Sequence, residues 1–418
     1  MRVVHPSVYM KQKERGKRRS RKRRRWIVLL IFVFLSYVSL TALATPTYKP
    51  ITQEVAIEHE PVEFSWPSSG TVSVGSSDGV DSLASNNGDV PVPSASTIKL
   101  LTALVVLEQK PLGATEQGEA IYFGAQDIDR FNETVAKGGA ALAVPVNTTI
   151  TYREALAAML IGSANNIADK LAIWGFGSVD AYNQAAKLYT KKLSLGSTKI
   201  TDASGLSATT ITSANDMLKI AKATMLSPAI SNIVKKTTFT LQNGTELHTT
   251  NTLLGNDGIV GLKTGNTEEA GYCLVVSKSV RVLGRDKILY VSTFGQPSHE
   301  AADAVATSML AQVQDGFQQV SIANKNQAIA EYEAPWGTLV EVKPRTNITA
   351  TRWKGVSVSA TVDMNSTKHA HKGDVVGGLT IDGQTYDLLL DGDLPPPSIW
   401  WRITNAVPSA VDFIVEKR

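Results

Sequence analysis

The 418-residue sequence predicts an α+β protein that also has an N-terminal apolar helix and a separate small all-β domain. Three observations support this fold class. Residues 26–44 contain no charged side chain. Residues 91–230 place apolar side chains mostly at helical spacing, and strand-like runs follow them. From residue 318 onward, short β-rich runs alternate with Gly, Pro and Asn, which is typical of a different, all-β unit.

The N-terminal segment combines a basic tail with an apolar run. Residues 1–25 carry 12 Lys or Arg and one Glu, which leaves 30 basic and 37 acidic residues in the rest of the chain. The basic charge therefore belongs to the tail and does not indicate nucleic-acid binding by the folded part. Residues 26–45 are predicted to be a transmembrane anchor, because a helix of this length crosses most of a bilayer core of about 30 Å.

The positive-inside rule would then keep the basic tail in the cytoplasm and place the remainder outside the cell membrane. A cleaved signal peptide, giving a secreted protein, is the alternative, because Ala42-Leu43-Ala44 has the small-x-small form of a processing site. The single cysteine, Cys273, excludes an internal disulfide and a cysteine metal cluster, and we expect it to be a small buried residue.

The rest of the chain divides into four predicted segments. Residues 46–60 are rich in Pro and polar residues and predict a linker. Residues 61–317 predict the main domain, an antiparallel sheet flanked by helices plus an all-helical part. Residues 318–394 predict the small β domain, and residues 395–418 predict an amphipathic tail, which either lies at a membrane interface or packs on its own domain.

The elements of the main domain follow from periodicity. Several helices begin with Ser or Thr, which can cap them. The predicted helices cover 96–108, 151–175, 179–193, 213–226 and 299–317, and the predicted strands cover 237–242, 258–265, 271–280 and 288–295.

One short motif opens the first of these helices. Ser96 and Lys99 stand three positions apart in "STIK", so the two side chains share a helix face. A serine becomes a nucleophile only when a base removes its proton, and a lysine can be that base if its pKa falls. Ser96 at a helix N-terminus also offers its backbone N–H to an oxyanion. The motif alone is weak, because a capped helix with an exposed lysine has the same sequence.

Two later motifs strengthen the interpretation of Ser96 and Lys99 as a nucleophile and its base. Ser163-Ala164-Asn165 follows a predicted helix, and Lys263-Thr264-Gly265 ends a predicted strand. Ser163 can pass a proton to a leaving amine, and Asn165 can orient the lysine and a substrate amide. Lys263 is the second cation that would lower the pKa of Lys99. With Thr264 it suits a terminal carboxylate, while Gly265 lets substrate lie close to the strand.

The order of these motifs resembles that of the penicillin-recognising serine hydrolases, and the chain is similar to serine-type D-alanyl-D-alanine carboxypeptidases, the low-molecular-mass penicillin-binding proteins. The resemblance extends to "DASGL" at 202–206 and "HKGDVVGGLTI" in the small β domain. It implies a β-lactamase/transpeptidase-like fold, Ser96 as the acylated nucleophile, Lys99 as its base, and backbone N–H groups of Ser96 and Asn266 as the oxyanion hole.

By the same resemblance, the substrates are peptidoglycan stem peptides, β-lactams acylate Ser96, and no cofactor is required. The residues 167–261 lack the Glu-x-x-Leu-Asn segment with which class A β-lactamases deacylate, which favours the carboxypeptidase. Ile98 stands where many members have Thr, and we expect it to face away from the site. The alternatives are a DD-endopeptidase, a β-lactamase, or a catalytically silent cell-wall-binding protein.

No metal site is predicted. The six histidines, His248, His369 and His371 among them, are scattered without carboxylate or cysteine spacing, and we expect them on the solvated surface.

Overall fold

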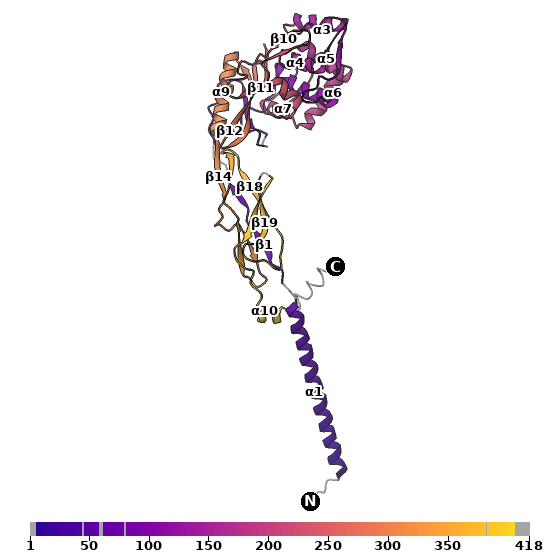
Figure 1. The fold of residues 1–418 in the computed structure, drawn as a ribbon, viewed down its shortest axis with the longest axis vertical. Helices are drawn as coiled ribbons and strands as arrows, with labels where there is room; N and C mark the ends of the chain where they lie inside the picture. The colour runs from indigo at the N-terminus through magenta and orange to yellow at the C-terminus, as the bar shows by residue number, and fades with distance from the viewer. Residues whose placement is uncertain (1–5, 44–45, 58–61, 79–80, 382, 406–418) are drawn as a thin grey trace. The chain divides into compact units, whose positions relative to one another are not determined.

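The computed structural model describes residues 6–43, 46–57, 62–78, 81–381 and 383–405 (Figure 1). The chain divides into two compact units, which are described separately below. The main unit consists of residues 59–319 and 351–356, and the β unit consists of residues 1–58, 320–350 and 357–418.

The N-terminal helix α1 spans Pro6–Leu43 and continues from the basic tail into the apolar run without interruption (Figure 1). No proline occurs after its first residue, so beyond the first turn every position can donate its backbone N–H within the helix. Residues 44 and 45 of the predicted anchor lie outside the described residues. Among the helices of the described part, none meets the length and hydropathy expected of a membrane span.

The main unit is built on a five-stranded sheet in the order β11-β12-β13-β3-β4, and all its neighbouring strands are antiparallel, as predicted. The tight turn at Leu283 and Gly284 joins its two longest strands, and both residues have positive φ, as a type I′ hairpin turn requires. The strands are β3 (Thr71–Ser76), β4 (Ala84–Asn86), β11 (Ile259–Thr267), β12 (Gly271–Val282) and β13 (Arg285–Gln296).

Both faces of this sheet are covered. Leu274 and Val276 of β12 join the apolar cluster of α9 (His299–Asp315), whereas the intervening Val275 joins the core of the helical part. This alternation follows from the two-residue period of a strand. The sheet therefore fixes β11 at one edge, with helical segments on one face and α9 on the other.

The helical part surrounds α2, whose residues from Lys99 to Val106 are all buried. Side chains of Thr151, Ser178, Ser213 and Ser298 accept hydrogen bonds from backbone N–H groups at helix starts, which confirms the predicted caps. The helices are η1 (Ala95–Ile98), α2 (Lys99–Gln109), α3 (Ala125–Ala136), α4 (Tyr152–Leu160), α5 (Asn165–Phe176), α6 (Val179–Lys192), α7 (Ala214–Leu226) and α8 (Pro228–Val234).

Three short antiparallel strand pairs complete this part of the main unit. They are β5 (Val92–Pro93) with β8 (Ile211–Thr212), β6 (Ala120–Phe123) with β7 (Thr148–Thr151), and β9 (Thr238–Thr240) with β10 (Glu246–His248).

The β unit contains a seven-stranded sheet in the order β1-β15-β16-β20-β19-β18-β2. Its strands are β1 (Lys49–Thr52), β2 (Val55–Ile57), β15 (Ala330–Glu333), β16 (Leu339–Pro344), β18 (Val358–Met364), β19 (Val375–Ile381) and β20 (Gln384–Leu390). Two further strands, β14 (Phe317–Ala323) and β17 (Ile348–Trp353), lead from one unit into the other.

The prediction of a linker at residues 46–60 was wrong for most of that segment. β1 pairs with β15, and β2 pairs with β18, so both belong to the sheet of the β unit. These strands have only four and three residues, too few to show an alternating pattern, and their partners lie about 280 to 300 residues away in the sequence. Residues 351–356 differ as well, because the buried Trp353 donates its indole N–H to the Val313 carbonyl at 3.1 Å within the main unit.

The described start of the predicted C-terminal tail forms α10 (Ile399–Thr404). Ser398 caps it by accepting a hydrogen bond from the Trp401 N–H at 3.1 Å. The Trp401 ring lies edge-on to Trp336, with ring centroids 5.2 Å apart, so this part of the tail packs on its own unit. Residues 406–418 of the predicted tail lie outside the described residues.

Candidate active site

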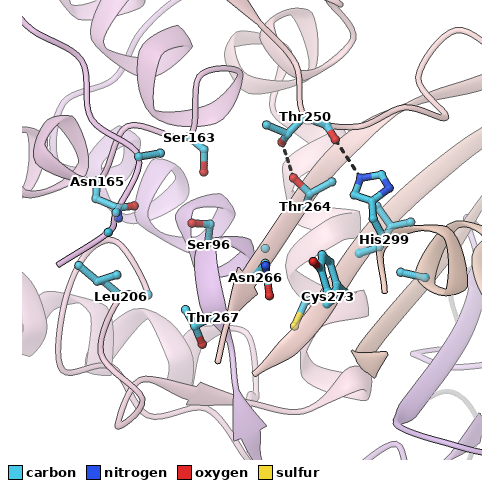
Figure 2. Close-up of a pocket in the computed structure, with 18 of the residues that line it drawn as sticks. Ser96, Ser163, Asn165, Leu206, Thr250, Thr264, Asn266, Thr267, Cys273 and His299 are labelled. Carbon is cyan, nitrogen blue, oxygen red and sulfur yellow. Dashed lines mark hydrogen bonds between the residues drawn. The ribbon is translucent and has the colours of Figure 1, made fainter. Parts of the chain in front are cut away.

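A cavity of about 300 Å³ lies beside Ser96 in the main unit (Figure 2). Its lining brings together six of the eight residues that the motifs predicted: Ser96, Ser163, Asn165, Thr264, Gly265 and Asn266. The remaining two, Lys99 and Lys263, are buried next to these residues, with 0% and 2% of their surfaces exposed. Segments about 170 residues apart in the sequence therefore converge on one site.

Four residues form what we call the lysine cluster: Ser96, Lys99, Ser163 and Asn165. The Lys99 Nζ atom lies 2.6 Å from the Ser96 Oγ atom and 3.5 Å from the Ser163 Oγ atom, and it also donates to the Asn165 side-chain oxygen. The contact with Ser96 is the one that the three-residue spacing predicted. One amine can therefore exchange a proton with either hydroxyl.

The local backbone explains how Ser96 is presented. Ser96 lies in the 3-10 turn η1, and the α-helix itself begins only at Lys99. The preceding residue, Ala95, has a positive φ of 44°, which turns the chain sharply into this element. The Thr97 hydroxyl donates to the Ser94 carbonyl at 2.6 Å and holds the turn closed. The nucleophile is thus carried by a constrained turn at the head of a buried helix.

Two glycines allow other segments to approach this turn. A Cβ atom at Gly265 would lie 2.9 Å from both the Ala95 Cβ and the Ser96 backbone nitrogen, and one at Gly205 would lie 1.9 Å from the Ala95 carbonyl oxygen. Both distances are shorter than van der Waals contact, so only glycine fits. The sequence predicted that Gly265 makes room for substrate. The structure shows that it makes room for the nucleophile's own turn.

The two buried lysines have lowered pKa values. Desolvation is the main cause for Lys99, and the Lys263 charge adds to it, so the pKa of Lys99 lies well below its ordinary value. Asp202 and Asp169 act in the opposite direction. Desolvation lowers the pKa of Lys263 to about 7, and its Nζ atom donates to the Thr264 carbonyl at 2.9 Å. Burial thus favours the neutral amine that a general base requires.

The "DASGL" segment, residues 202–206, is hydrogen-bonded to α2 and contributes residues to the cavity lining. The Asp202 carboxylate accepts hydrogen bonds from the Leu206 N–H at 2.9 Å and from the Thr210 hydroxyl at 2.5 Å, which folds the loop on itself. The Ala203 carbonyl accepts from Thr102 of α2 at 2.7 Å. This loop places Gly205 and Leu206 at the cavity, and the described lining contains no glutamate.

A second group of side chains, which the motifs identified only in part, lines the same cavity (Figure 2). We call Thr250, Thr264, His299 and Asp303 the threonine cluster. The Thr250 and Thr264 hydroxyls are hydrogen-bonded to each other. The His299 Nε2 atom lies 3.3 Å from the Thr250 carbonyl oxygen, and its Nδ1 atom lies 3.4 Å from Asp303 Oδ2. The expectation that the histidines lie on the surface was therefore wrong for His299.

The sequence contains one pattern that indicates part of this cluster. His299 and Asp303 have the i, i+4 spacing of a helical pair, directly after the strand that ends the sheet. The other expectations were correct: His248, His369 and His371 are exposed, and Ile98 is buried in the core away from the cavity lining.

Cys273 is buried as predicted, and desolvation raises the pKa of its thiol to about 12, so the thiolate is disfavoured. Within the described residues, no group of histidine, cysteine and carboxylate side chains could hold a metal ion.

Residues 76–285 match the family model of the D-alanyl-D-alanine carboxypeptidases, the peptidases of family S11. The chain belongs to this family of serine peptidases. It is 30% identical over 287 residues to a D-alanyl-D-alanine endopeptidase of Pseudomonas aeruginosa, an alignment that covers 66% of this chain and 85% of that protein. It is 28% identical over 198 residues to the D-alanyl-D-alanine carboxypeptidase DacA of Escherichia coli, covering 47% and 49% of the two chains.

Solved structures share the fold of this chain. Penicillin binding protein 5 of Haemophilus influenzae superposes with a TM-score of 0.59 at 21% identity, covering 80% of this chain and 99% of that chain. The carboxypeptidase DacD of Francisella tularensis superposes with a TM-score of 0.56 at 18% identity, covering 83% and 98%. The β-lactamase/transpeptidase-like fold that the motifs implied is thereby confirmed.

Proposed function

We propose that the protein removes the terminal D-alanine from peptidoglycan stem peptides through an acyl-enzyme on Ser96. The contact that carries this proposal is the 2.6 Å distance between Lys99 Nζ and Ser96 Oγ, in a site where burial lowers the pKa of the lysine. A neutral amine at this distance can take the hydroxyl proton as the oxygen attacks.

Acylation then proceeds in two steps. The Ser96 oxygen attacks the carbonyl carbon of the penultimate D-alanine, and Lys99 receives the hydroxyl proton. The N–H groups of Ser96 and Asn266 hold the developing oxyanion. When the carbon–nitrogen bond breaks, Lys99 returns the proton through Ser163, 3.5 Å away, to the leaving amine. Water then hydrolyses the ester, which releases the shortened peptide and restores Ser96.

The threonine cluster suits the other end of the substrate. The Thr264 and Thr250 hydroxyls lie at the cavity, and the buried Lys263 ammonium lies behind Thr264. Hydroxyl donors with a nearby cation favour a carboxylate. A free terminal carboxylate distinguishes the end of a stem peptide from its interior, so this arrangement selects the terminal D-alanine.

The test compares wild type with Ser96→Ala. Mass spectrometry of stem pentapeptides before and after incubation should show loss of one D-alanine with the wild type only, and a fluorescent penicillin should label only the wild type. Labelling of the Ser96→Ala variant would overturn the assignment of the nucleophile. An intact fold in the variant, checked by its thermal unfolding midpoint, is the necessary control.

A DD-endopeptidase is the second candidate, because the relative in Pseudomonas aeruginosa that aligns over 85% of its length is named as one. Cross-linked dimeric muropeptides distinguish the two activities. Release of monomers from dimers at a rate above that of D-alanine release from pentapeptides would favour the endopeptidase. A β-lactamase requires rapid turnover, and the absence of glutamate from the described cavity lining supports a long-lived penicilloyl-enzyme instead.

The same proposal includes a membrane anchor at residues 26–45, with the catalytic unit outside the cytoplasm. Its support is the uncharged run at 26–44, placed directly after the basic tail. Fractionation of cells followed by protease treatment of spheroplasts tests it. A membrane-bound protein whose catalytic unit is digested from outside supports the anchor. A soluble protein starting near residue 45 would instead show that the segment is cleaved.

A further inference from the structure

His299 occupies a place in the cavity that the mechanism above does not use. It is the first residue of α9, its side chain is 33% exposed, and it lies on the same side as Thr264 (Figure 2). Its ring nitrogens face the Thr250 carbonyl at 3.3 Å and the Asp303 carboxylate at 3.4 Å. A titratable group therefore lies where the leaving residue must bind.

Both neighbours of the His299 ring are hydrogen-bond acceptors. A carbonyl oxygen can only accept, so the Nε2 atom carries a proton. The Nδ1 atom faces Asp303 Oδ2, and an ionised carboxylate likewise only accepts. The contacts of the ring are thus fully satisfied only when both nitrogens are protonated, which gives the imidazolium a positive charge.

One of the two carboxylate oxygens of Asp303 accepts no hydrogen bond from the described residues. Its Oδ2 atom accepts a hydrogen bond from the Thr252 hydroxyl at 2.5 Å. Its Oδ1 atom is buried and has no hydrogen-bond partner among the described residues. A carboxylate with an unpaired oxygen lines the cavity that, under the proposed function, must also receive the carboxylate of the leaving D-alanine.

Like charges in one partly buried cavity repel each other. With a neutral His299, the pair of His299 and Asp303 carries a net negative charge and opposes an anionic leaving residue. With His299 protonated the pair is neutral, and the Thr250 segment stays fixed by the Nε2 hydrogen bond while its hydroxyl and that of Thr264 face the ligand.

We infer that His299, positioned by Asp303, selects leaving residues with a free carboxylate only while its ring is protonated. The inference rests on the proposed carboxylate site at Thr264, and it assigns His299 and Asp303 as specificity-determining and positioning residues. It also makes substrate affinity depend on pH through a group outside the three motifs.

The surroundings of His299 act in both directions on its protonation. On α9, Asp303 and Glu300 favour the charged ring, whereas the positive end of the α9 dipole disfavours it. From β12, the Tyr272 ring contacts the imidazole edge-on, with ring centroids 6.5 Å apart. From β11, Lys263 reaches the Thr264 carbonyl and would oppose a further cation.

The test measures KM and kcat between pH 5.5 and 8.5 for two peptides. One is an acylated tripeptide that ends in D-Ala-D-Ala, and the other is its C-terminal carboxamide. For the wild type, KM of the acid should rise up to about fivefold relative to that of the amide as pH increases, which is the effect of losing one partly exposed charge. In His299→Gln, this ratio should be higher at pH 5.5 and should change less with pH than in the wild type, because only the loss of the Lys263 charge then contributes, while His299→Lys should keep the ratio low at pH 8.5.

Asp303→Asn refines the assignment. Loss of the carboxylate removes a group that favours the charged ring, so the pH at which the KM ratio rises should move to a lower value. His248→Gln, at an exposed position with a side chain 68% exposed, is the matched control and should reproduce the wild-type profile. A wild-type pH dependence of the KM ratio in His299→Gln would overturn the inference.

A second readout separates this inference from the proposed function. Acylation rates with a penicillin and its methyl ester compare a carboxylate with a neutral ester without requiring D-alanine release. The ratio of the two rates should fall with pH in the wild type and fall less steeply in His299→Gln, where only the Lys263 charge still changes. If the enzyme releases no D-alanine but this ratio behaves as expected, the carboxypeptidase proposal fails and the role of His299 stands.

Discussion

The lysine cluster and the threonine cluster face the same cavity but differ in how completely their polar groups are satisfied. Lys99 is fully buried and contacts three oxygen atoms, two hydroxyls that take part in the proposed proton transfers and the Asn165 amide oxygen that orients the amine. In the threonine cluster, His299 is half-buried, and Asp303 keeps a buried oxygen without a partner among the described residues.

This difference follows from the two tasks. Proton transfer requires reacting groups that are already at their final distances, and burial in a packed helical core fixes them. Binding a charged substrate requires groups that gain partners from the substrate, so some of their capacity must remain open. The lysine cluster is thus preorganised for chemistry, whereas the threonine cluster is completed by its ligand.

The largest loss should come from removing the base. Lys99→Met keeps the length of the buried side chain but leaves Ser96 without a proton acceptor, so the rate constant for penicillin acylation should fall about a thousandfold. Stopped-flow measurement of fluorescent penicillin binding checks this. Lys192→Met, at an exposed position of α6, is the control and should keep the wild-type rate. A loss below tenfold would show that another group removes the proton.

Gly265→Ala should increase the distance between β11, which carries Thr264, and η1, which carries Ser96. The added methyl group would lie 2.9 Å from the Ser96 backbone nitrogen, so β11 and η1 must move apart. Displacements of about 1 Å at a reacting group cost roughly a hundredfold in rate, and we expect kcat/KM to fall by that factor. Gly196→Ala, with nothing within 4 Å of the added atom, is the matched control. Equal activity of the two variants would contradict this contact.

The sequence predicted the two clusters unequally well, for a physical reason. The lysine cluster depends on short spacings within segments, such as Ser96 and Lys99 one helical turn apart, and on two further motifs of fixed form. Thr250 and His299 gain their roles only when the segment before β11 and the start of α9 meet at the sheet edge. The helix caps and the antiparallel sheet were predictable because they rest on local patterns.

In the β unit, too, contacts between distant segments could not be predicted from local sequence patterns. The strands β1 and β2 consist of four and three residues, and their pairing with β15 and β18 satisfies backbone groups without any marked apolar pattern. Such pairing depends on distant segments, which a local reading of residues 46–60 interprets as a linker. The packing of Trp353 into the main unit could not be predicted from the sequence for the same reason.

Thr264→Val tests the recognition side with a nearly isosteric change. It removes the hydroxyl that bonds Thr250 and lines the cavity. A hydrogen bond to a charged ligand group contributes about 1.5–3 kcal/mol, so KM for the acid peptide should rise at least about tenfold with a smaller change in kcat. Initial rates with the acid and carboxamide peptides check this, and Thr149→Val on β7 is the control. An equal rise in KM for the carboxamide would argue against carboxylate binding.

The smallest effect should come from Lys263→Met, measured with the carboxamide peptide so that carboxylate binding does not contribute. The rate rises with pH as Lys99 loses its proton, and the Lys263 charge helps to lower the pKa of Lys99. Removing that charge should therefore move the acidic limb of the rate profile to higher pH. An unchanged limb would show that desolvation alone sets the pKa of Lys99.

The same substitution should also change stability, and the sign can be worked out from the pKa of Lys263. That pKa is about 7 in the folded chain and near 10.5 in the unfolded chain, so between these values the unfolded state binds more protons and stability rises with pH. Below pH 7 the folded wild type must hold a buried ammonium, which Lys263→Met lacks. The variant should therefore gain about 1–3 kcal/mol in free energy of unfolding at pH 6 relative to the wild type, and less at pH 9. Urea unfolding at the two pH values measures this, and a gain that does not depend on pH would mean that packing rather than charge accounts for it.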